Sequence, residues 1–272
     1  MRRVGGAISI TVGLALAAGA ATATDPLVVE PRMIGDVDAG QLYVEDATAI
    51  GDDLAFLGTH GRERLSLRWF DADRDRERKL QTVWSGEMPR EVTTARDKVL
   101  FTGYREREGT EPWRSDGTRA GTRLIREIHP GRQSAKCVPG TDCPAFPAGS
   151  DPQSFVTIGR TTYFAANHPT SGRELWRTNG ARAGTRLVRD IWPGDGSSLL
   201  GYTESLVDFD GQLFFTADDG RHGLELWRTD GTRAGTRMVR DIGPGGSLPW
   251  WGSGPVVAGE YLYLTADRAD EG

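Results

Sequence analysis

The residues of this chain that could carry out catalysis are few and scattered. No HExxH, GxSxG or phosphate-binding loop pattern is present. The adjacent carboxylates Asp218 and Asp219 fit a turn at least as well as they fit the acid and base of a glycosidase. The four histidines fall at unequal positions of the repeat described below: His60, His129, His168 and His222. The sequence therefore predicts no catalytic residues and a chain that is not an enzyme.

The two cysteines point to a covalent cross-link. Cys137 and Cys143 lie in the segment CVPGTDC, and the chain contains no other cysteine. A structural zinc site needs four ligands, which two thiols cannot supply, and no histidine is near them in sequence. In an oxidising compartment we expect a local disulfide.

Aromatic residues suggest recognition of a sugar or a peptide. His129 and Trp192 occupy a variable position in a recurring Ile-x-Pro-Gly segment. Tyr202, Trp250 and Trp251 fall in segments expected on the same side of the fold. Aromatic rings beside polar groups suit carbohydrate or peptide binding. We predict these five residues as a ligand-binding set; the alternative is that the rings pack between loops.

A repeated sequence must position these residues. The 21 residues 225–245 (ELWRTDGTRAGTRMVRDIGPG) recur as 174–194 and as 111–131. In each copy two apolar runs joined by a turn precede this segment, for example 205–209 and 213–217, separated by Asp-Gly. Each unit thus reads as four β-strands, the fourth covering Thr-Arg-Met-Val-Arg-Asp-Ile in the last full copy. The second strand is apolar on both faces, as expected between two neighbouring sheets.

Four-stranded units at this spacing are typical of a β-propeller. Glu111 and Glu174 are 63 residues apart, and Glu174 and Glu225 are 51 apart. We predict an all-β propeller of about five units within residues 24–272. The units are expected at 41–85, 86–131, 151–194, 202–245 and, incomplete, 252–272, with an insertion at 132–150.

The ends of the repeat array support two further expectations. Residues 32–35 (Arg-Met-Ile-Gly) resemble 240–243, so the chain begins with a fourth-strand sequence that could complete the last unit and close the ring. Residues 261–267 match 212–218, but no third-strand sequence follows them. We expect either a last unit of three strands or a truncated chain.

The repeated polar residues have two interpretations. Asp230 and its equivalents could form one metal site per unit, with calcium as the candidate ion. Alternatively, they serve turns and pairing, with Asp230 capping its own turn and Arg240 pairing with Glu225 or Asp241 across strands or units. Asn179 replaces Asp230 in one copy, and asparagine makes the same turn but is a poorer calcium ligand. We therefore expect turn chemistry and no required cofactor.

Composition and the N-terminus indicate export. Arg2 and Arg3 precede an apolar stretch, residues 8–20, and an Ala-Thr-Ala cleavage pattern at 21–23, so residues 1–23 read as a signal peptide. A membrane anchor is the alternative, and no later stretch is long enough to span a bilayer. The net charge is −5 and cationic and anionic residues are interleaved, which argues against a nucleic-acid partner and leaves no obvious face of one sign.

Two families share features with the repeat. Residues 225–232 (ELWRTDGT) resemble the repeat of the ELWxxDGT-repeat family of bacterial secreted proteins, with departures at Pro112, Ser115, Asn179 and Ala181 in the other copies. This resemblance implies an exported, propeller-like protein and supplies no catalytic residues. A weaker resemblance to the Asp-box turn of sialidase-type propellers departs in spacing.

These observations converge on a secreted protein, extracellular or periplasmic. We predict a non-enzymatic binding module that meets carbohydrate or protein at the cell surface through the loop-rich face of the propeller. A propeller enzyme acting on glycans and a calcium-stabilised scaffold are the alternatives.

Overall fold

The computed structural model describes residues 42–60, 64–82, 91–134, 145–199, 206–242, 248 and 254–265. These residues form antiparallel β-strands, with one 3-10 turn at Arg182–Gly184 and no α-helix. No helix among them has the length and apolarity needed to cross a bilayer. The all-β prediction is confirmed for the described part of the chain.

Four sheets contain four strands each, hydrogen-bonded in chain order, and we call them units 1 to 4. Unit 1 consists of β1 (Leu42–Ile50), β2 (Asp53–His60), β3 (Ser66–Asp71) and β4 (Arg76–Thr82). Unit 2 consists of β5 (Val92–Ala95), β6 (Lys98–Arg105), β7 (Gly109–Ser115) and β8 (Arg123–Leu124). Unit 3 consists of β11 (Gln153–Ile158), β12 (Thr161–His168), β13 (Gly172–Thr178) and β14 (Arg186–Leu187). Unit 4 consists of β15 (Leu206–Phe209), β16 (Gln212–Asp218), β17 (Leu224–Thr229) and β18 (Arg237–Met238).

Two hairpins accompany the four units. One, β9 (Arg132–Ser134) with β10 (Ala145–Pro147), lies in the sequence insertion between units 2 and 3. The other, β19 (Val256–Ala258) with β20 (Tyr261–Tyr263), follows unit 4 and corresponds to the first two strands of a unit.

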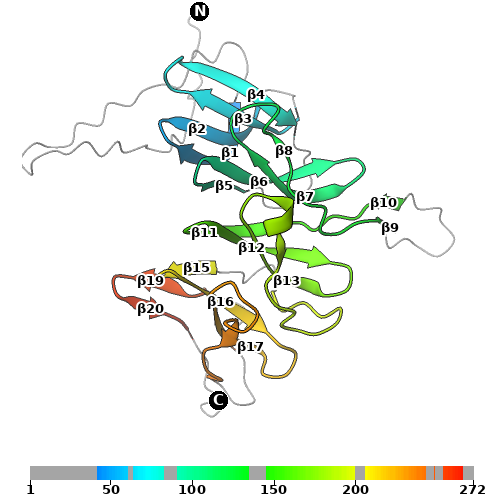
Figure 1. Ribbon diagram of the computed structural model, residues 1–272, viewed down its shortest axis with the longest axis vertical. Coiled ribbons are helices and arrows are strands. Elements are labelled where there is room, and N and C mark those ends of the chain that lie inside the picture. Colours follow the sequence, from blue (N-terminus) through cyan, green and yellow to red (C-terminus); the bar gives the residue numbers. More distant parts are fainter. Residues whose placement is uncertain are drawn as a thin grey trace, which may run out of the picture.

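The sheets follow one another along the long axis of the molecule (Figure 1). Strands β1, β5, β11, β15 and β19, the first of each sheet, lie next to one another in that order. Unit 1 and the β19–β20 hairpin lie at opposite ends of this row (Figure 1), so the described residues do not close a ring. Residues 32–35, predicted to close it, lie outside the described part of the chain.

The hydrophobic core consists of three clusters, each between two successive sheets. Strand β12 shows why a second strand must be apolar on both faces. Its Phe164 packs in the cluster shared with unit 2, and the neighbouring Tyr163 and Ala165 pack in the cluster shared with unit 4. Phe164 and Ala165 are fully buried. The prediction of a strand buried on both faces is confirmed here.

The fourth strands differ from the sequence prediction. Strands β8, β14 and β18 have two residues each, whereas a seven-residue strand was predicted over Thr-Arg-Met-Val-Arg-Asp-Ile. After Arg237–Met238 the N–H of Val239 donates to the carbonyl of Leu226, 2.8 Å away. The N–H of Ile242 then donates to the carboxylate of Glu225 instead of to a strand partner. The buried side chain of Glu225 therefore ends the hydrogen-bond ladder of the fourth strand, although the apolar residues of the sequence predict that this strand continues.

The connections between strands lie at two opposite ends of the sheets, which we call the loop end and the turn end. The loop end carries the connections between second and third strands (106–108, 169–171, 219–223) and the segments after the fourth strands (125–131, 188–194, 239–242). The turn end carries the connections between third and fourth strands: 116–122, 179–185 and 230–236.

Candidate functional site

The recurring glutamate holds the backbone at the loop end. Oε2 of Glu174 accepts a hydrogen bond from the N–H of Ile191 at 3.2 Å and from the hydroxyl of Ser198 at 2.7 Å. Its Oε1 accepts from the N–H of Trp192 at 3.1 Å. Burial raises the pKa of the Glu174 carboxyl to about 7, while these three donors favour its ionised form.

Unit 2 repeats this arrangement around Glu111. Its carboxylate accepts from the N–H groups of Ile128 and His129, at 3.0 and 2.9 Å, and from the hydroxyl of Ser150 at 2.5 Å. Burial raises its pKa to about 7 as well. In both units, backbone N–H groups and a serine hydroxyl are the hydrogen-bond donors to the carboxylate oxygens.

The recurring Asp-Gly forms a capped turn, as predicted. Oδ1 of Asp230 accepts from the N–H of Thr232 at 2.8 Å and from its hydroxyl at 2.7 Å, which lowers the pKa of Asp230. Asn179 makes the same turn through its Oδ1, 3.1 Å from the N–H of Ala181. Within the described residues no group of three or more His, Cys, Asp or Glu side chains is placed to hold a metal ion.

The recurring arginine of the tail joins each unit to the next. Nη1 of Arg189 donates to the carbonyl of Thr236 at 2.6 Å, and the guanidinium lies over the Trp227 ring at 5.7 Å. In the same way, Nη1 of Arg126 donates to the carbonyl of Thr185 at 2.7 Å, and its guanidinium lies over the Trp176 ring at 6.0 Å. The sequence predicted that this arginine pairs with a carboxylate across strands or units; for Arg126 and Arg189 the partner is instead a main-chain carbonyl of the following unit. Stacking suits a planar guanidinium, so both contacts favour arginine over lysine.

The variable position of Ile-x-Pro-Gly lies on this fixed backbone. His129 and Trp192 are both half-buried at the loop end, directly after the isoleucine that the glutamate holds. The glutamate bonds fix the main chain of each residue and do not involve its side chain. The same backbone position can therefore present different chemistry from unit to unit.

The His129 junction, between units 2 and 3, is polar. Burial, and then electrostatic interactions with His129 and Arg126, lower the pKa of His168. His168 also lies against Trp176, with ring centroids 5.7 Å apart. Burial raises the pKa of Asp151, which is opposed by the charges of Arg173 and His129. The junction thus gathers ionisable groups whose charge is set by their surroundings.

The Trp192 junction, between units 3 and 4, is built around an indole ring. The indole lies against Gly196 of its own loop and against Gly220 of the next unit, where a Cβ would come within 2.3 and 2.6 Å of ring atoms. Trp192 is therefore partly a packing residue, which is the alternative that the sequence left open. Beside it, Nδ1 of His222 lies 2.8 Å from Oδ2 of Asp219, and this contact raises the pKa of His222.

Three residues of the predicted ligand-binding set, Tyr202, Trp250 and Trp251, lie outside the described part of the chain, as do Cys137 and Cys143. His129 and Trp192 belong to successive junctions of the same end. Asp151 and Arg173 were not among the predicted site residues. They can be distinguished in the sequence because the equivalent repeat positions carry apolar residues. Leu199 is equivalent to Asp151, and Leu224 is equivalent to Arg173. The equivalence follows from the bonds of Asp151 to Thr110 and of Leu199 to Arg173.

Comparison with known proteins identifies no family. No family model and no curated protein matches the chain. Among solved structures, a puromycin-hydrolyzing peptidase of Mycobacterium tuberculosis aligns with 70% of the chain at 12% identity and a TM-score of 0.43. An alpha-L-arabinofuranosidase of Clostridium thermocellum aligns with 72% at 12% identity and a TM-score of 0.33. A puromycin hydrolase aligns with 75% at 17% identity and a TM-score of 0.30. The chain spans 30% of the length of the first, 71% of the second and 39% of the third.

Proposed function

We propose that this chain is an exported, non-enzymatic binding module that engages its ligand at the loop end of the sheets. The observation that carries the proposal is the glutamate arrangement. Glu111 and Glu174 fix the backbone of a position whose side chain differs between units, His129 in one and Trp192 in the other. A rigid main chain that presents interchangeable side chains is suited to recognition.

The distribution of the repeated polar groups supports a non-enzymatic role. The glutamates, the turn aspartates and the tail arginines each bond to the protein's own main chain. They are therefore committed to folding. Burial raises the pKa of the Asp151 carboxyl and lowers that of the His168 imidazole. We assign both groups to hydrogen bonding with a ligand, since an imidazole that is neutral both donates and accepts.

We further propose that the units are consecutive blades of a β-propeller, with the first strands lining its axis. The neighbouring positions of β1, β5, β11, β15 and β19 support this arrangement. Export is proposed on the N-terminal sequence and on the resemblance of residues 225–232 to the ELWxxDGT repeat.

The binding proposal is tested with the full chain on an array of neutral glycans and on a set of peptides. We expect a specific ligand whose affinity falls by roughly tenfold in the His129→Ala/His168→Ala double variant, the loss of one good polar contact. The control is Arg96→Ala, at the opposite end of unit 2 between β5 and β6. An unchanged affinity in the double variant would refute the loop-end site. Release of reducing sugar from a bound glycan would replace the binding module with the glycosidase alternative.

A further inference from the structure

One strand breaks the symmetry of the repeat. Strand β4 runs over seven residues, Arg76–Thr82, whereas its equivalents β8, β14 and β18 have two. It pairs with β3 from Asp71↔Arg76 to Ser66↔Thr82. Unit 1 therefore has a wall at its outer edge that units 2 to 4 do not have.

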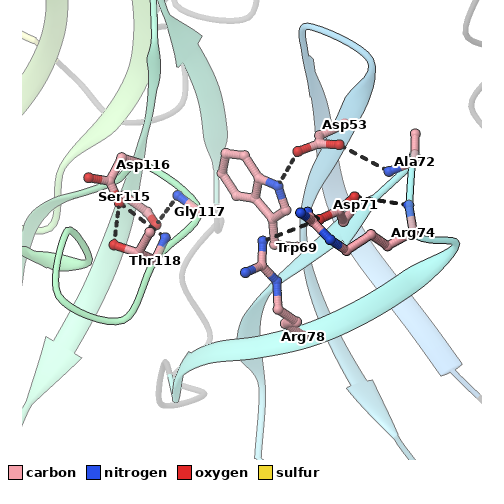
Figure 2. Close-up of polar contacts among 10 residues, drawn as sticks. All are labelled: Asp53, Trp69, Asp71, Ala72, Arg74, Arg78, Ser115, Asp116, Gly117 and Thr118. Atoms are coloured by element: carbon pink, nitrogen blue, oxygen red, sulfur yellow. Dashed lines mark hydrogen bonds and ion pairs between the residues drawn. The ribbon is translucent and has the colours of Figure 1, made fainter.

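This wall faces the turn between β7 and β8 of unit 2 across a cavity of about 490 Å³, which is in the range of ligand sites. Residues 76–80 line one side, and Gly117, Thr118 and Arg119 line the other. Figure 2 shows the Trp69 side chain directed between the two walls. A Cβ on Gly117, whose φ is +81°, would lie 2.8 Å from the indole, so the glycine lets the turn close against this ring.

The turn that forms the second wall is rigid. The hydroxyl of Ser115 bonds to that of Thr122 at 2.7 Å, and Asp116 accepts from the N–H and hydroxyl of Thr118 at 3.0 and 2.7 Å. On the opposite side Asp53 accepts from the Trp69 indole at 2.7 Å and from the N–H of Ala72 (Figure 2). The cavity therefore has preformed walls.

Its lining is cationic, although the chain as a whole carries a net charge of −5. The four cationic residues of the lining are Arg76, Arg78, Lys79 and Arg119. The one carboxylate in the lining, Glu77, is held by Arg68. The interleaved charges of the sequence leave no obvious face of one sign, and this mainly cationic groove arises because the fold brings β4 together with a turn about 40 residues further along.

Among the described residues, the neighbouring acidic groups form an ion pair with Arg78 but not with Arg76 or Arg119. Asp71 bonds to Arg74 at 2.6 Å and lies 4.0 Å from Arg78. Asp116 is occupied by Thr118. The exposed side chains of Arg76 and Arg119 form no ion pair with any described residue. Their guanidinium groups are available to an anion from outside.

We propose that this groove binds an anionic polysaccharide through its carboxylate or sulfate groups. Guanidinium groups bind such oxyanions with two parallel hydrogen bonds. Arg76 and Arg119 lie on the two opposite walls of the groove, which favours a chain of spaced charges over a single anion. Trp69 is only 5% exposed and offers no surface on which a nucleobase could stack, so the sugar chain is favoured over nucleic acid. The site lies at the turn end and is independent of the loop-end function proposed above.

The test is calorimetric titration of the full chain with four probes: a heparin hexasaccharide, an oligogalacturonate, maltohexaose and an oligodeoxythymidine. We compare the protein with Arg76→Ala/Arg119→Ala and with Arg186→Ala/Arg237→Ala. The second variant removes two exposed arginines from β14 and β18, so it makes the same change in net charge away from the groove.

We expect the sulfated or the carboxylated sugar to bind, the choice between them identifying the anion, and maltohexaose not to bind. The affinity should fall at least about tenfold in the groove variant and less than about twofold in the control. The proposal is overturned if neither charged sugar binds with a Kd below about 1 mM. It is equally overturned if both variants lose the same affinity, or if the oligodeoxythymidine binds as tightly as the sugars.

Discussion

The backbone N–H of Trp192 donates a hydrogen bond to Oε1 of Glu174 across 3.1 Å. Glu111 holds His129 in the same way at 2.9 Å, so one carboxyl per unit anchors the segment that follows the fourth strand. Both carboxyls are buried, and both have a pKa raised to about 7 from 4.5.

The protein should therefore lose stability as the pH rises from 5 to 8.5. A folded-state pKa above the unfolded one means that the stabilising contribution is complete below pH 4.5 and is lost as the pH passes through about 7. The loss is on the order of 2–3 kcal/mol for each carboxyl. Thermal unfolding across this range measures it.

Glu111→Gln/Glu174→Gln is the matching variant. At pH 5 the carboxyl is already protonated, so the amide replaces one neutral group by another and stability at pH 5 should fall by less than about 1 kcal/mol per site. The pH dependence should flatten, because the titrating group has gone. A variant that keeps the full slope would assign the titration to other residues.

Arg189 should stabilise the junction between units 3 and 4. Arg189→Ala removes the bond to the Thr236 carbonyl and the contact with the Trp227 ring, and should cost about 1–3 kcal/mol of unfolding free energy. Arg240 occupies the same repeat position but is exposed, so Arg240→Ala should change stability by less than about 0.5 kcal/mol. Equal losses in the two variants, measured by urea unfolding, would argue against the contact across the junction.

Much of this architecture is readable in the sequence. The strands follow from alternating apolar residues and Asp-Gly turns, and the Asp230 turn forms as expected because its geometry is local. The partners of Arg189 and of Glu174 were not predictable, because both bonds join residues 17 or more positions apart that only the stacking of sheets or the path of the loop brings together. The groove beside β4 was not predictable for the same reason, because its two walls are about 40 residues apart in the sequence.

Trp192 and Gly220 should depend on one another. Gly220→Ala introduces a Cβ 2.6 Å from the indole at a backbone φ of +76°. It should destabilise the protein and shift Trp192 emission to longer wavelength. Gly211→Ala is the control, since its φ is +72° but nothing lies within 4 Å of the added atom. The difference between the two variants, about 1–3 kcal/mol, isolates the ring contact; no difference would mean that the indole moves aside freely.

Asp230 distinguishes the turn from a calcium site. Asp230→Asn should change stability by less than about 0.5 kcal/mol, because Asn179 already makes this turn in unit 3. Asp230→Ala should cost about 1 kcal/mol through the lost bonds to Thr232. The melting temperature of the parent chain should be independent of added calcium. A rise with calcium that Asp230→Asn abolishes would favour the scaffold alternative.

The contacts of Arg126 and Arg189 have a consequence for how such a chain can evolve. Each joins its own unit to the one that follows, using a carbonyl and an indole that the repeat itself supplies. Cohesion is then a property of adjacent pairs rather than of the whole molecule. A tandem duplication of one unit would arrive with its junction already encoded, so the number of sheets can change by recombination while each copy keeps a compatible neighbour.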